Sequence, residues 1–248
     1  MNKVLLVTGG SAGIGAATVR LAAARGYKVA FSYRSSGAMA RALEAEVKQA
    51  GGTALGFQAD AADEVATEAL FASVDEAFGP LTALVTNAGI TGSTSSLENI
   101  TGSTLDQVMD INIRGVFLAT RAAIKRMATD LGGAGGAIVN LSSMAANLGG
   151  PNDWVHYAAS KGAINSFTIG AAKELAPRGI RVNAVVPGLI DTEIHAKAGL
   201  GDRLAKLGST VPLGRVGTAD EVAMAILWLL SDEASYVTGA LLPVAGGR

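Results

Sequence analysis

The chain has 248 residues, of which 49% are hydrophobic, and its 20 basic and 21 acidic side chains leave a formal net charge of −1. A chain of this length can bury a full hydrophobic core, so we expect a single domain over residues 1–248. The near-neutral charge and the lack of a basic run argue against a nucleic-acid partner.

Other features of the composition narrow the class further. Cysteine is absent and the two histidines, His156 and His195, lie far apart in the chain, so neither a disulfide framework nor a metal site is expected. No stretch approaches about twenty consecutive apolar residues, the length that a spanning helix needs. Residues 1–7 make one strand-length run without the pattern of a signal peptide. We therefore expect a cytoplasmic protein with no membrane partner.

Strand-length apolar runs alternate with helix-length segments along the chain. The predicted strands are 4–8, 29–33, 53–58, 81–86, 137–142, 181–186 and 241–244. The predicted helices are 13–25, 38–50, 63–78, 101–130, 153–176 and 219–231. This alternation predicts an α/β fold, a doubly wound parallel sheet of seven strands with helices on both faces. Segment 188–218 has scattered glycines and no sustained period, which predicts a long loop or a lid of short helices beside the substrate.

A glycine-rich segment, TGGSAGIG at residues 8–15, follows the first predicted strand and opens the first helix. The glycines lack a Cβ, so the backbone can approach a ligand, and the amides at a helix N-terminus attract a pyrophosphate. A simple tight turn is the alternative interpretation. A P-loop is excluded, because Ala16 follows Gly15 where that motif needs a lysine.

Tyr157 and Lys161 stand four residues apart in the predicted helix 153–176. Positions i and i+4 share a helix face, so the Lys161 ammonium can lie near the Tyr157 phenol and favour its ionised form. A phenol that titrates near pH 10 in water would then serve as an acid or base closer to neutral pH.

The glycine segment and the Tyr-x-x-x-Lys pair together resemble the short-chain dehydrogenase/reductase family, and the resemblance covers nearly the whole chain. The segment TNAG at 86–89 is similar to the family's Asn-Asn-Ala-Gly element, with Thr86 in place of the first asparagine. The other matching positions are Asn112 in helix 101–130, Ser142 and Ser143 at the end of the fifth strand, and Pro187, Gly188, Ile190 and Thr192 after the sixth. The resemblance implies a Rossmann-type domain.

The resemblance also implies hydride transfer between a nicotinamide and a carbonyl or alcohol carbon. Tyr157 would exchange the proton, Ser143 would hydrogen-bond the substrate oxygen, and Lys161 would tune the phenol and grip the nicotinamide ribose. Asn112 would hold a water that links Lys161 to solvent, or tie down a backbone kink, and the two interpretations are compatible.

The choice of serine depends on spacing. Ser143 stands one residue farther from Tyr157 than the family's usual serine, and Ser142 stands two residues farther. We therefore choose Ser143 and expect one extra residue in the loop near Asn152. A strand-end hydroxyl that bonds only within a turn is the alternative role.

The nucleotide site implied by the resemblance contains Gly9, Ser11, Gly13, Ile14, Gly15, Tyr33, Arg34, Ser35, Asp60, Ala61, Asn87, Ala88, Gly89, Tyr157, Lys161, Pro187, Gly188, Ile190 and Thr192. Tyr33 stands where NAD-dependent relatives carry an acidic residue that binds the ribose hydroxyls. Arg34, Ser35 and Ser36 would suit a 2′-phosphate, which predicts NADP(H) over NAD(H). Against this, Ala12 stands where many NADP-dependent relatives carry a basic residue, and a solvated arginine is the alternative role for Arg34.

The substrate side is mostly apolar and predicts a small carbonyl or alcohol without naming it. The positions implied are Ser143, Met144, Asn147, Trp154, Leu189, Ile190 and His195. We expect His156 to be a packing or helix-surface residue. The helix 153–176 carries more apolar residues than one stripe needs, including Phe167 and Ile169, which predicts a homo-oligomer, a dimer or a tetramer.

Two other classes of protein compete with this prediction. One is a dinucleotide-binding sensor or scaffold without catalysis, in which the four catalytic positions would be free to change. The other is a methyltransferase on a similar sheet, which would not require the tyrosine and lysine pair. Titration with NADPH, NADH and S-adenosylmethionine would separate these classes.

Overall fold

One sheet of seven parallel strands organises the protein, in the order β3-β2-β1-β4-β5-β6-β9. The structure is a computed structural model that describes residues 3–192 and 207–248. The strands are β1 Val4–Val7, β2 Lys28–Tyr33, β3 Thr53–Gln58, β4 Ala83–Thr86, β5 Gly136–Leu141, β6 Ile180–Pro187 and β9 Leu241–Val244. The predicted parallel sheet is confirmed, with strand ends that differ from the prediction by at most two residues.

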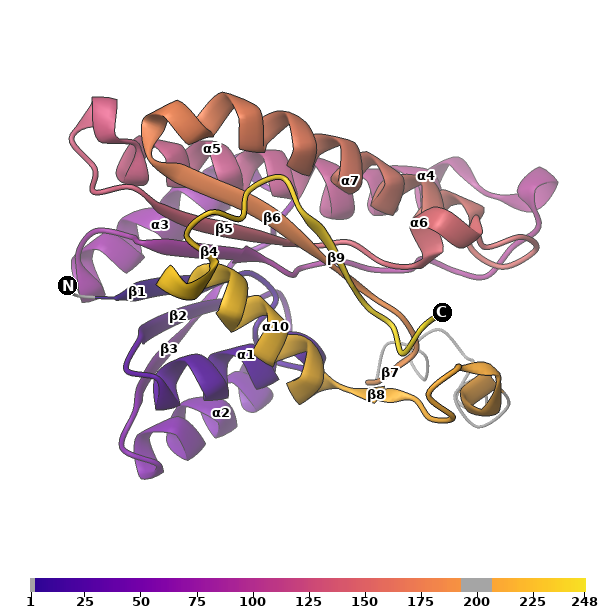
Figure 1. The fold of residues 1–248 in the computed structure, drawn as a ribbon, viewed down its shortest axis with the longest axis horizontal. Helices are drawn as coiled ribbons and strands as arrows, with labels where there is room; N and C mark the ends of the chain where they lie inside the picture. The colour runs from indigo at the N-terminus through magenta and orange to yellow at the C-terminus, as the bar shows by residue number, and fades with distance from the viewer. Residues whose placement is uncertain (1–2, 193–206) are drawn as a thin grey trace.

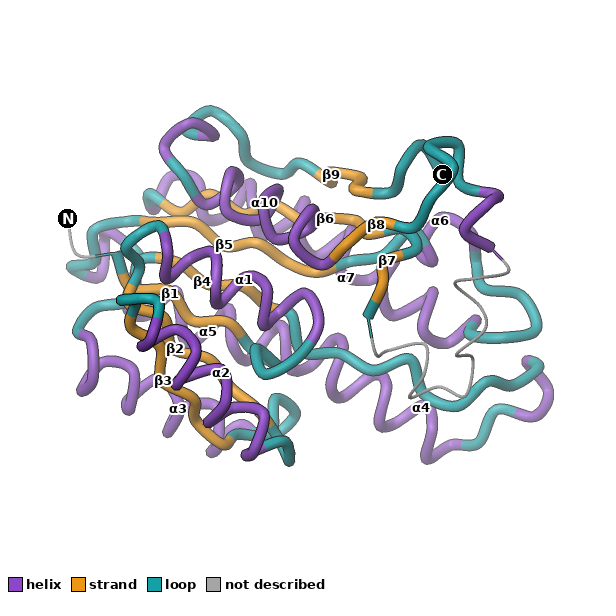
Figure 2. The backbone as a smooth tube through the Cα atoms, turned by 90° about the horizontal axis from the view of Figure 1, so that it is seen from below, coloured by secondary structure: helices purple, strands orange, loops and turns teal. Residues whose placement is uncertain are grey.

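Helices cover both faces of this sheet, as Figures 1 and 2 show. One layer contains α1 Gly13–Ala24, α2 Gly37–Gln49 and α10 Ala219–Leu230, and the other contains α3 Glu64–Phe78, α5 Gly115–Met127 and α7 Val155–Leu175. Two shorter helices, α4 Gly102–Met109 and α6 Ala145–Leu148, flank the second layer. Within residues 3–192 and 207–248, no helix is long and apolar enough to cross a membrane.

The strand β1 illustrates why an uninterrupted apolar run forms a central strand. Its residues are all fully buried, and successive side chains point to opposite faces of a sheet. Val4 and Leu6 pack with the layer of α3, α5 and α7, whereas Leu5 and Val7 pack with the layer of α1, α2 and α10. Each of these side chains contributes about 1.5–3 kcal/mol through burial, so both faces need apolar residues.

The helix expected over 101–130 is present as a continuous helical stretch over residues 102–127, but a π-helical turn interrupts its α-helical hydrogen bonding. α4 ends at Met109, the π-helical turn Asp110–Arg114 follows, and α5 begins at Gly115. Asn112 in this turn bonds the backbone of Ile90, which anchors the turn to the segment after β4. A Cβ on Gly115 would lie 2.9 Å from the carbonyl oxygen of Ala61. Contacts with distant segments therefore set the position of the π-helical turn, which helical periodicity did not show.

The segment 188–218 contains two short strands that the sequence did not predict. β7 Ile190–Asp191 pairs in parallel with β8 Gly217–Thr218. Two residues per strand are too few to show an alternation of apolar and polar positions. Residues 193–206, which include His195, lie outside the described residues, so the lid predicted there stays a prediction.

Candidate active site

A cavity of about 1180 Å³ opens at the carboxyl end of the sheet. Its walls are the segments that follow β1, β2, β3, β4, β5 and β6. β1 lies between β2 and β4, and after β3 at the sheet edge the chain crosses over to form β4. The cavity therefore spans the point where the winding direction of the sheet reverses, which is where doubly wound folds bind ligands.

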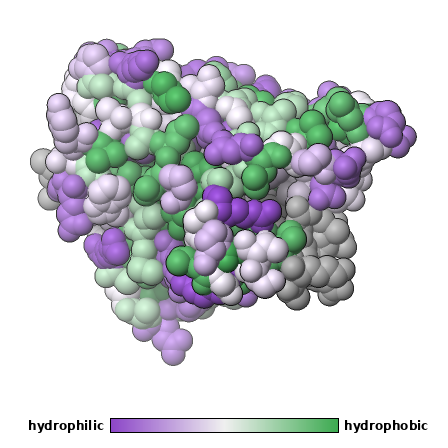
Figure 3. Space-filling model, turned by 45° about the vertical axis from the view of Figure 1, so that its right-hand side comes forward, coloured by the Kyte–Doolittle hydropathy of each residue, from purple (hydrophilic) through white to green (hydrophobic). Residues whose placement is uncertain are grey.

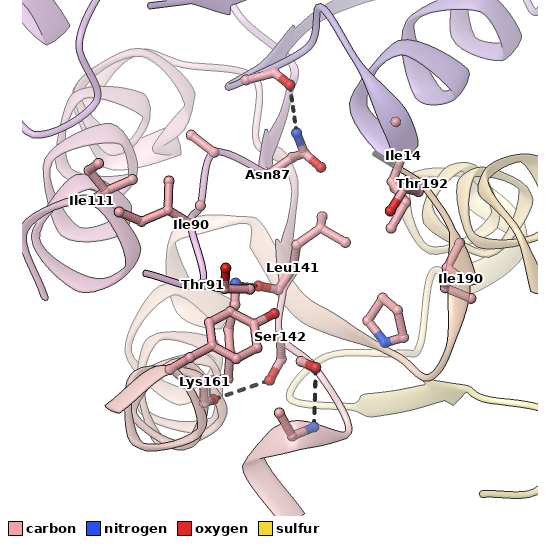
Figure 4. A pocket seen from close by; sticks show the side chains of 18 of the residues that line it. Ile14, Asn87, Ile90, Thr91, Ile111, Leu141, Ser142, Lys161, Ile190 and Thr192 are labelled. Carbon is pink, nitrogen blue, oxygen red and sulfur yellow. Dashed lines mark hydrogen bonds between the residues drawn. The ribbon is translucent and has the colours of Figure 1, made fainter. Parts of the chain in front are cut away.

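Most of the predicted site residues meet in this cavity, and Figure 4 shows several of them from close by. The predicted nucleotide residues in its lining are Gly9, Gly13, Ile14, Tyr33, Arg34, Ser35, Asp60, Ala61, Asn87, Ala88, Gly89, Tyr157, Lys161, Pro187, Gly188, Ile190 and Thr192. The predicted substrate residues in it are Ser143, Met144, Trp154, Leu189 and Ile190. Ser11, Gly15, Asn112 and Asn147 are not part of the lining.

The glycine turn is shaped by close packing against the segment after β4. A Cβ on Gly9, whose φ is 63°, would lie 2.9 Å from the Cα of Ala88. A Cβ on Gly15 would lie 2.6 Å from both Asn87 Nδ2 and the carbonyl oxygen of Gly9. Gly15 thus packs beneath the turn and outside the cavity lining, and its predicted part in nucleotide binding stays a prediction.

The N-terminus of α1 is open to an anionic ligand. Ala12 occupies the capping position and makes no side-chain cap, and the first turn contains no acidic residue. The first amides of a helix lack partners within the helix and attract negative charge. Gly13 and Ile14, the first two residues of α1, line the cavity. This arrangement fits the pyrophosphate of a dinucleotide.

Asn87 and Thr8 hold the turn in place from below. Asn87 Nδ2 donates hydrogen bonds to the carbonyl oxygens of Thr8 and Gly9, at 3.0 and 2.8 Å. Thr8 Oγ1 accepts bonds from the backbone amides of Asn87 and Ala88, at 3.0 and 3.1 Å. Four hydrogen bonds therefore join the ends of β1 and β4, the two strands at the reversal point.

The two adjacent serines after β5 have different environments. Ser142 is buried, and its hydroxyl donates to the carbonyl oxygen of Lys161 on α7 at 3.1 Å. The Ser143 hydroxyl hydrogen-bonds the Tyr157 side chain and accepts a bond from the amide of Ala145 at 3.1 Å. Ser142 thus joins β5 to α7, whereas Ser143 lies beside the phenol, as the sequence prediction expected.

Lys161 lies in the wall behind Tyr157. Its Nζ donates to the carbonyl oxygen of Leu141 at 2.7 Å and lies 5.7 Å from the centre of the Tyr157 ring. A Cβ on Gly89 would lie 3.5 Å from this Nζ. Burial lowers the pKa of Lys161 from 10.5 to about 8, because a charged amine loses its hydration in the interior.

The pKa of the Tyr157 phenol is raised, whereas the sequence predicted a lowered pKa. Burial raises the pKa of Tyr157 above 10.0, and the hydrogen bond with Ser143 acts in the opposite direction. Desolvation disfavours the phenolate more than the neighbouring groups stabilise it. The phenol is therefore protonated at neutral pH in this structure.

Asn112 lies outside the lining, fully buried beneath Gly89. Its Nδ2 donates to the carbonyl oxygen of Ile90 at 2.8 Å and to Ser160 Oγ at 3.0 Å, and its Oδ1 accepts from the amide of Ile90 at 2.8 Å. The side chain therefore ties down the π-helical turn, which is one of its two predicted roles. A Cβ on Gly89 would lie 3.2 Å from its Oδ1, so Asn112 also approaches the segment beside Lys161.

The far end of the cavity lies between the segments after β2 and β3. Tyr33, Arg34, Ser35 and Ser36 line it from one side, and Asp60 lines it from the other. Arg34 is exposed, and its guanidinium has no hydrogen bond or ion pair with another described residue. Asp60 Oδ1 accepts from the amide of Ala62 at 3.0 Å. This end thus presents an arginine and two serine hydroxyls.

His156 is a packing residue, as expected. Its side chain is buried and does not line the cavity. A Cβ on Gly92 would lie 2.9 Å from its Nε2 and equally close to the side chain of Val108. Neither ring nitrogen has a hydrogen-bond partner among the described residues.

The cavity also contains residues that sequence reasoning missed, among them Ile90, Thr91, Leu148, Pro151, Leu207 and Arg248. Ile90 and Thr91 directly follow the segment TNAG, and that position was the signal that could have found them. No local pattern marks Leu207 or Arg248, because their positions depend on contacts that the segments 207–218 and 245–248 make with residues distant in the chain.

Comparison with known proteins gives a consistent result. Residues 9–248 match the family model described as Enoyl-(Acyl carrier protein) reductase. The chain is 49% identical over 245 residues to the uncharacterized oxidoreductase YgfF of Escherichia coli K12, covering 99% of each chain. A dehydrogenase/reductase structure from Sinorhizobium meliloti 1021 superimposes with a TM-score of 0.91 at 36% identity, covering 99% of this chain and 94% of that chain.

A second solved structure is a short-chain dehydrogenase from Burkholderia cenocepacia J2315 in complex with NADP. It superimposes with a TM-score of 0.89 at 36% identity, covering 99% of this chain and 97% of that chain. The chain therefore belongs to the short-chain dehydrogenase/reductase family of NAD(P)-dependent oxidoreductases.

Proposed function

We propose that the protein interconverts a carbonyl and an alcohol group on a small substrate, with Tyr157 as the general acid and base. The observation that carries the proposal is the convergence of Tyr157, Ser143 and Lys161 on one cavity that also contains the glycine turn. A bound nicotinamide would supply or accept the hydride.

Each of the three side chains has a role that its environment supports. The Tyr157 phenol is protonated at neutral pH, which suits donation of its proton to the substrate oxygen during reduction. The Ser143 hydroxyl beside it would donate a second hydrogen bond to that oxygen. Lys161, with its pKa near 8, carries a charge at neutral pH and would bind ribose hydroxyls and favour proton release from the phenol in oxidation. Asn112 would position the segment after β4 and the helix α7 through its hydrogen bonds to Ile90 and Ser160.

For the nucleotide we propose NADP(H) over NAD(H). Arg34, Ser35 and Ser36 line the far end of the cavity, and the strand that precedes them ends in Tyr33 instead of a carboxylate. A guanidinium and hydroxyl groups can bind a 2′-phosphate through charge-assisted hydrogen bonds, whereas a carboxylate would repel it. The complex of the Burkholderia relative with NADP is consistent with this choice.

We also propose a homo-oligomer, a dimer or a tetramer, that uses an outer surface formed by α4, α5 and α7. On these helices Phe117 is 53% exposed, Ile169 is 40% exposed and Leu105 is 37% exposed. The Phe117 ring contacts that of Phe167, with centroids 4.5 Å apart, so α5 and α7 lie side by side. Figure 3 shows one face of the molecule, on which hydrophobic and hydrophilic residues are mixed. Covering these rings with a second copy would remove apolar area from water.

The remaining expectations stay predictions. These are a single domain over residues 1–248, a substrate segment near 188–218 and a cytoplasmic location. The cysteine-free composition supports the last of them.

The test of the proposed function is a panel of carbonyl and alcohol compounds followed at the nicotinamide absorbance, with Tyr157→Phe as the decisive variant. This variant keeps the ring and removes the transferable proton, so turnover should fall at least about 10²-fold while NADPH still binds. Tyr236→Phe is the matched control, because Tyr236 is fully exposed and is not part of the cavity lining. Near-normal turnover by Tyr157→Phe would refute the assigned acid. Nucleotide binding without turnover of any compound by the unmodified protein would favour a sensor or scaffold.

A further inference from the structure

Residues 245–248, at the end of the described chain, form a turn at two glycines that leads back to the cavity. After β9 ends at Val244, Gly246 and Gly247 adopt φ values of 64° and 92°, which side chains rarely allow. A Cβ on Gly246 would lie 2.7 Å from Val211 Cγ1. The carbonyl oxygen of Gly246 accepts a hydrogen bond from the amide of Leu213 at 3.1 Å. The turn therefore lies tightly against residues 211–213.

This turn places Arg248 in the lining of the cavity. The Arg248 side chain is half-buried and makes no hydrogen bond or ion pair with any residue in the described part of the chain. Lys161 differs, because its ammonium already donates to Leu141. A partly buried guanidinium without an acceptor is costly unless something else supplies one.

The position of the turn assigns Arg248 to the substrate side. The amide of Gly188 donates to the carbonyl oxygen of Val244 at 3.1 Å, so the end of β9 lies against the segment that continues into Leu189. The walls on this side of the cavity are apolar and include Met144, Leu148, Trp154 and Leu189. Arg34, the other arginine that lines the cavity among the described residues, lies at the end formed after β2.

Apolar walls strengthen any ion pair made between them, because the local dielectric constant is lower than that of water. A guanidinium in such a place matches a carboxylate or phosphate through paired N–H donors. Asp153 lines the same side, and it is already engaged in an interaction within the protein. Asp153 therefore already has a partner, whereas the Arg248 guanidinium has none among the described residues.

We propose that the substrate carries an oxyanion, a carboxylate or a phosphate, that Arg248 binds while the carbonyl group reaches Tyr157. The role of the carbonyl group in this proposal rests on the function proposed above. The binding of the oxyanion by Arg248 is independent of that function, because binding can be measured without turnover.

The first experiment measures binding to the NADP⁺-loaded protein, so that the nucleotide already occupies the anion sites of the glycine turn and of Arg34. Calorimetry compares pentanoate with its methyl ester. Arg248→Gln should weaken pentanoate binding at least about tenfold, with a much smaller effect on the ester. Arg248→Lys keeps the charge and should retain most of the affinity. Arg25→Gln, at an exposed arginine outside the lining, is the matched control.

The second experiment measures kcat/KM with NADPH for 3-oxobutanoate, 4-oxopentanoate and 5-oxohexanoate against their methyl esters. Dihydroxyacetone phosphate against dihydroxyacetone tests the phosphate arm. The ratio of acid to ester, or of phosphate to free ketone, should exceed about ten in the unmodified protein and fall at least about tenfold in Arg248→Gln, through KM. The arm with the larger ratio identifies the oxyanion.

The outcomes separate the two proposals. If the unmodified protein does not prefer the anionic compounds, or if Arg248→Gln changes charged and neutral compounds equally, the oxyanion site is refuted while carbonyl reduction stands. If pentanoate binds through Arg248 and no carbonyl compound is reduced, the oxyanion site stands and the reductase proposal fails.

Discussion

Replacing Lys161 with methionine should make the nucleotide-free protein more stable while it abolishes turnover. Lys161 is 5% exposed, and the carbonyl oxygen of Leu141 is the hydrogen-bond acceptor of its ammonium within the described residues. Burial lowers its pKa from 10.5 to about 8. Such a fall corresponds to about 3 kcal/mol of unfavourable free energy for the charged form in the fold.

Methionine has a similar shape and no charge, so Lys161→Met removes this penalty. It also leaves the Leu141 carbonyl without a partner, at a cost of about 1 kcal/mol. The net gain in the free energy of unfolding at pH 7 should be about 2 kcal/mol. For a chain of this length that corresponds to a rise in Tm of about 4–8 °C.

The pH dependence gives an independent check. In the unfolded chain Lys161 keeps its proton up to about pH 10.5, whereas in the fold it releases the proton near pH 8. Between these values the unfolded state binds more protons, so the free energy of unfolding rises with pH. Lys161→Met lacks this rise. The raised pKa of Tyr157 acts in the opposite direction above pH 10, and it is present in both proteins.

The assay is urea unfolding of both proteins without nucleotide at pH 7 and pH 9.5, because bound nucleotide would itself stabilise the fold. Lys48→Met is the matched control at an exposed lysine of α2, and it should change stability by less than about 0.5 kcal/mol. The reasoning is refuted if Lys161→Met is no more stable than the unmodified protein at pH 7. An equal pH slope in both proteins would also refute it.

Three further predictions follow from the site and the helical surface. Arg34→Asp should weaken NADP binding at least about tenfold more than NAD binding, because repulsion replaces a charge-assisted pair, and equal changes for both nucleotides would leave Arg34 without a role in selectivity. Gly15→Ala should lower the free energy of unfolding by about 1–3 kcal/mol and weaken nucleotide binding, because its Cβ would meet backbone at 2.6 Å; Gly102→Ala, with open space around it, should do neither. Light scattering should give about two or four times 24.9 kDa, and Phe117→Asp should reduce that mass, whereas an active monomer of the unmodified chain would contradict the proposed assembly.

The sequence by itself determined the sheet, the glycine turn and the pairing of Tyr157 with Lys161. These features follow from local patterns. A run such as 4–7, apolar at every position, predicts a strand covered on both faces, and spacing by four residues places two side chains on one face of a helix. Most of the residues that the likeness of these motifs to the family implied for the site line one cavity.

The tertiary structure decided the features that depend on residues far apart in the chain. The π-helical turn at Asn112 follows from its bonds to Ile90, and the different environments of Ser142 and Ser143 follow from contacts with α7. The raised pKa of Tyr157 depends on burial by several segments, so spacing alone gave the wrong direction. Arg248 reaches the cavity only because the residues before it pack on 211–213. Contacts of this kind leave no local periodicity, because their free energy depends on neighbours that only the folded chain brings together.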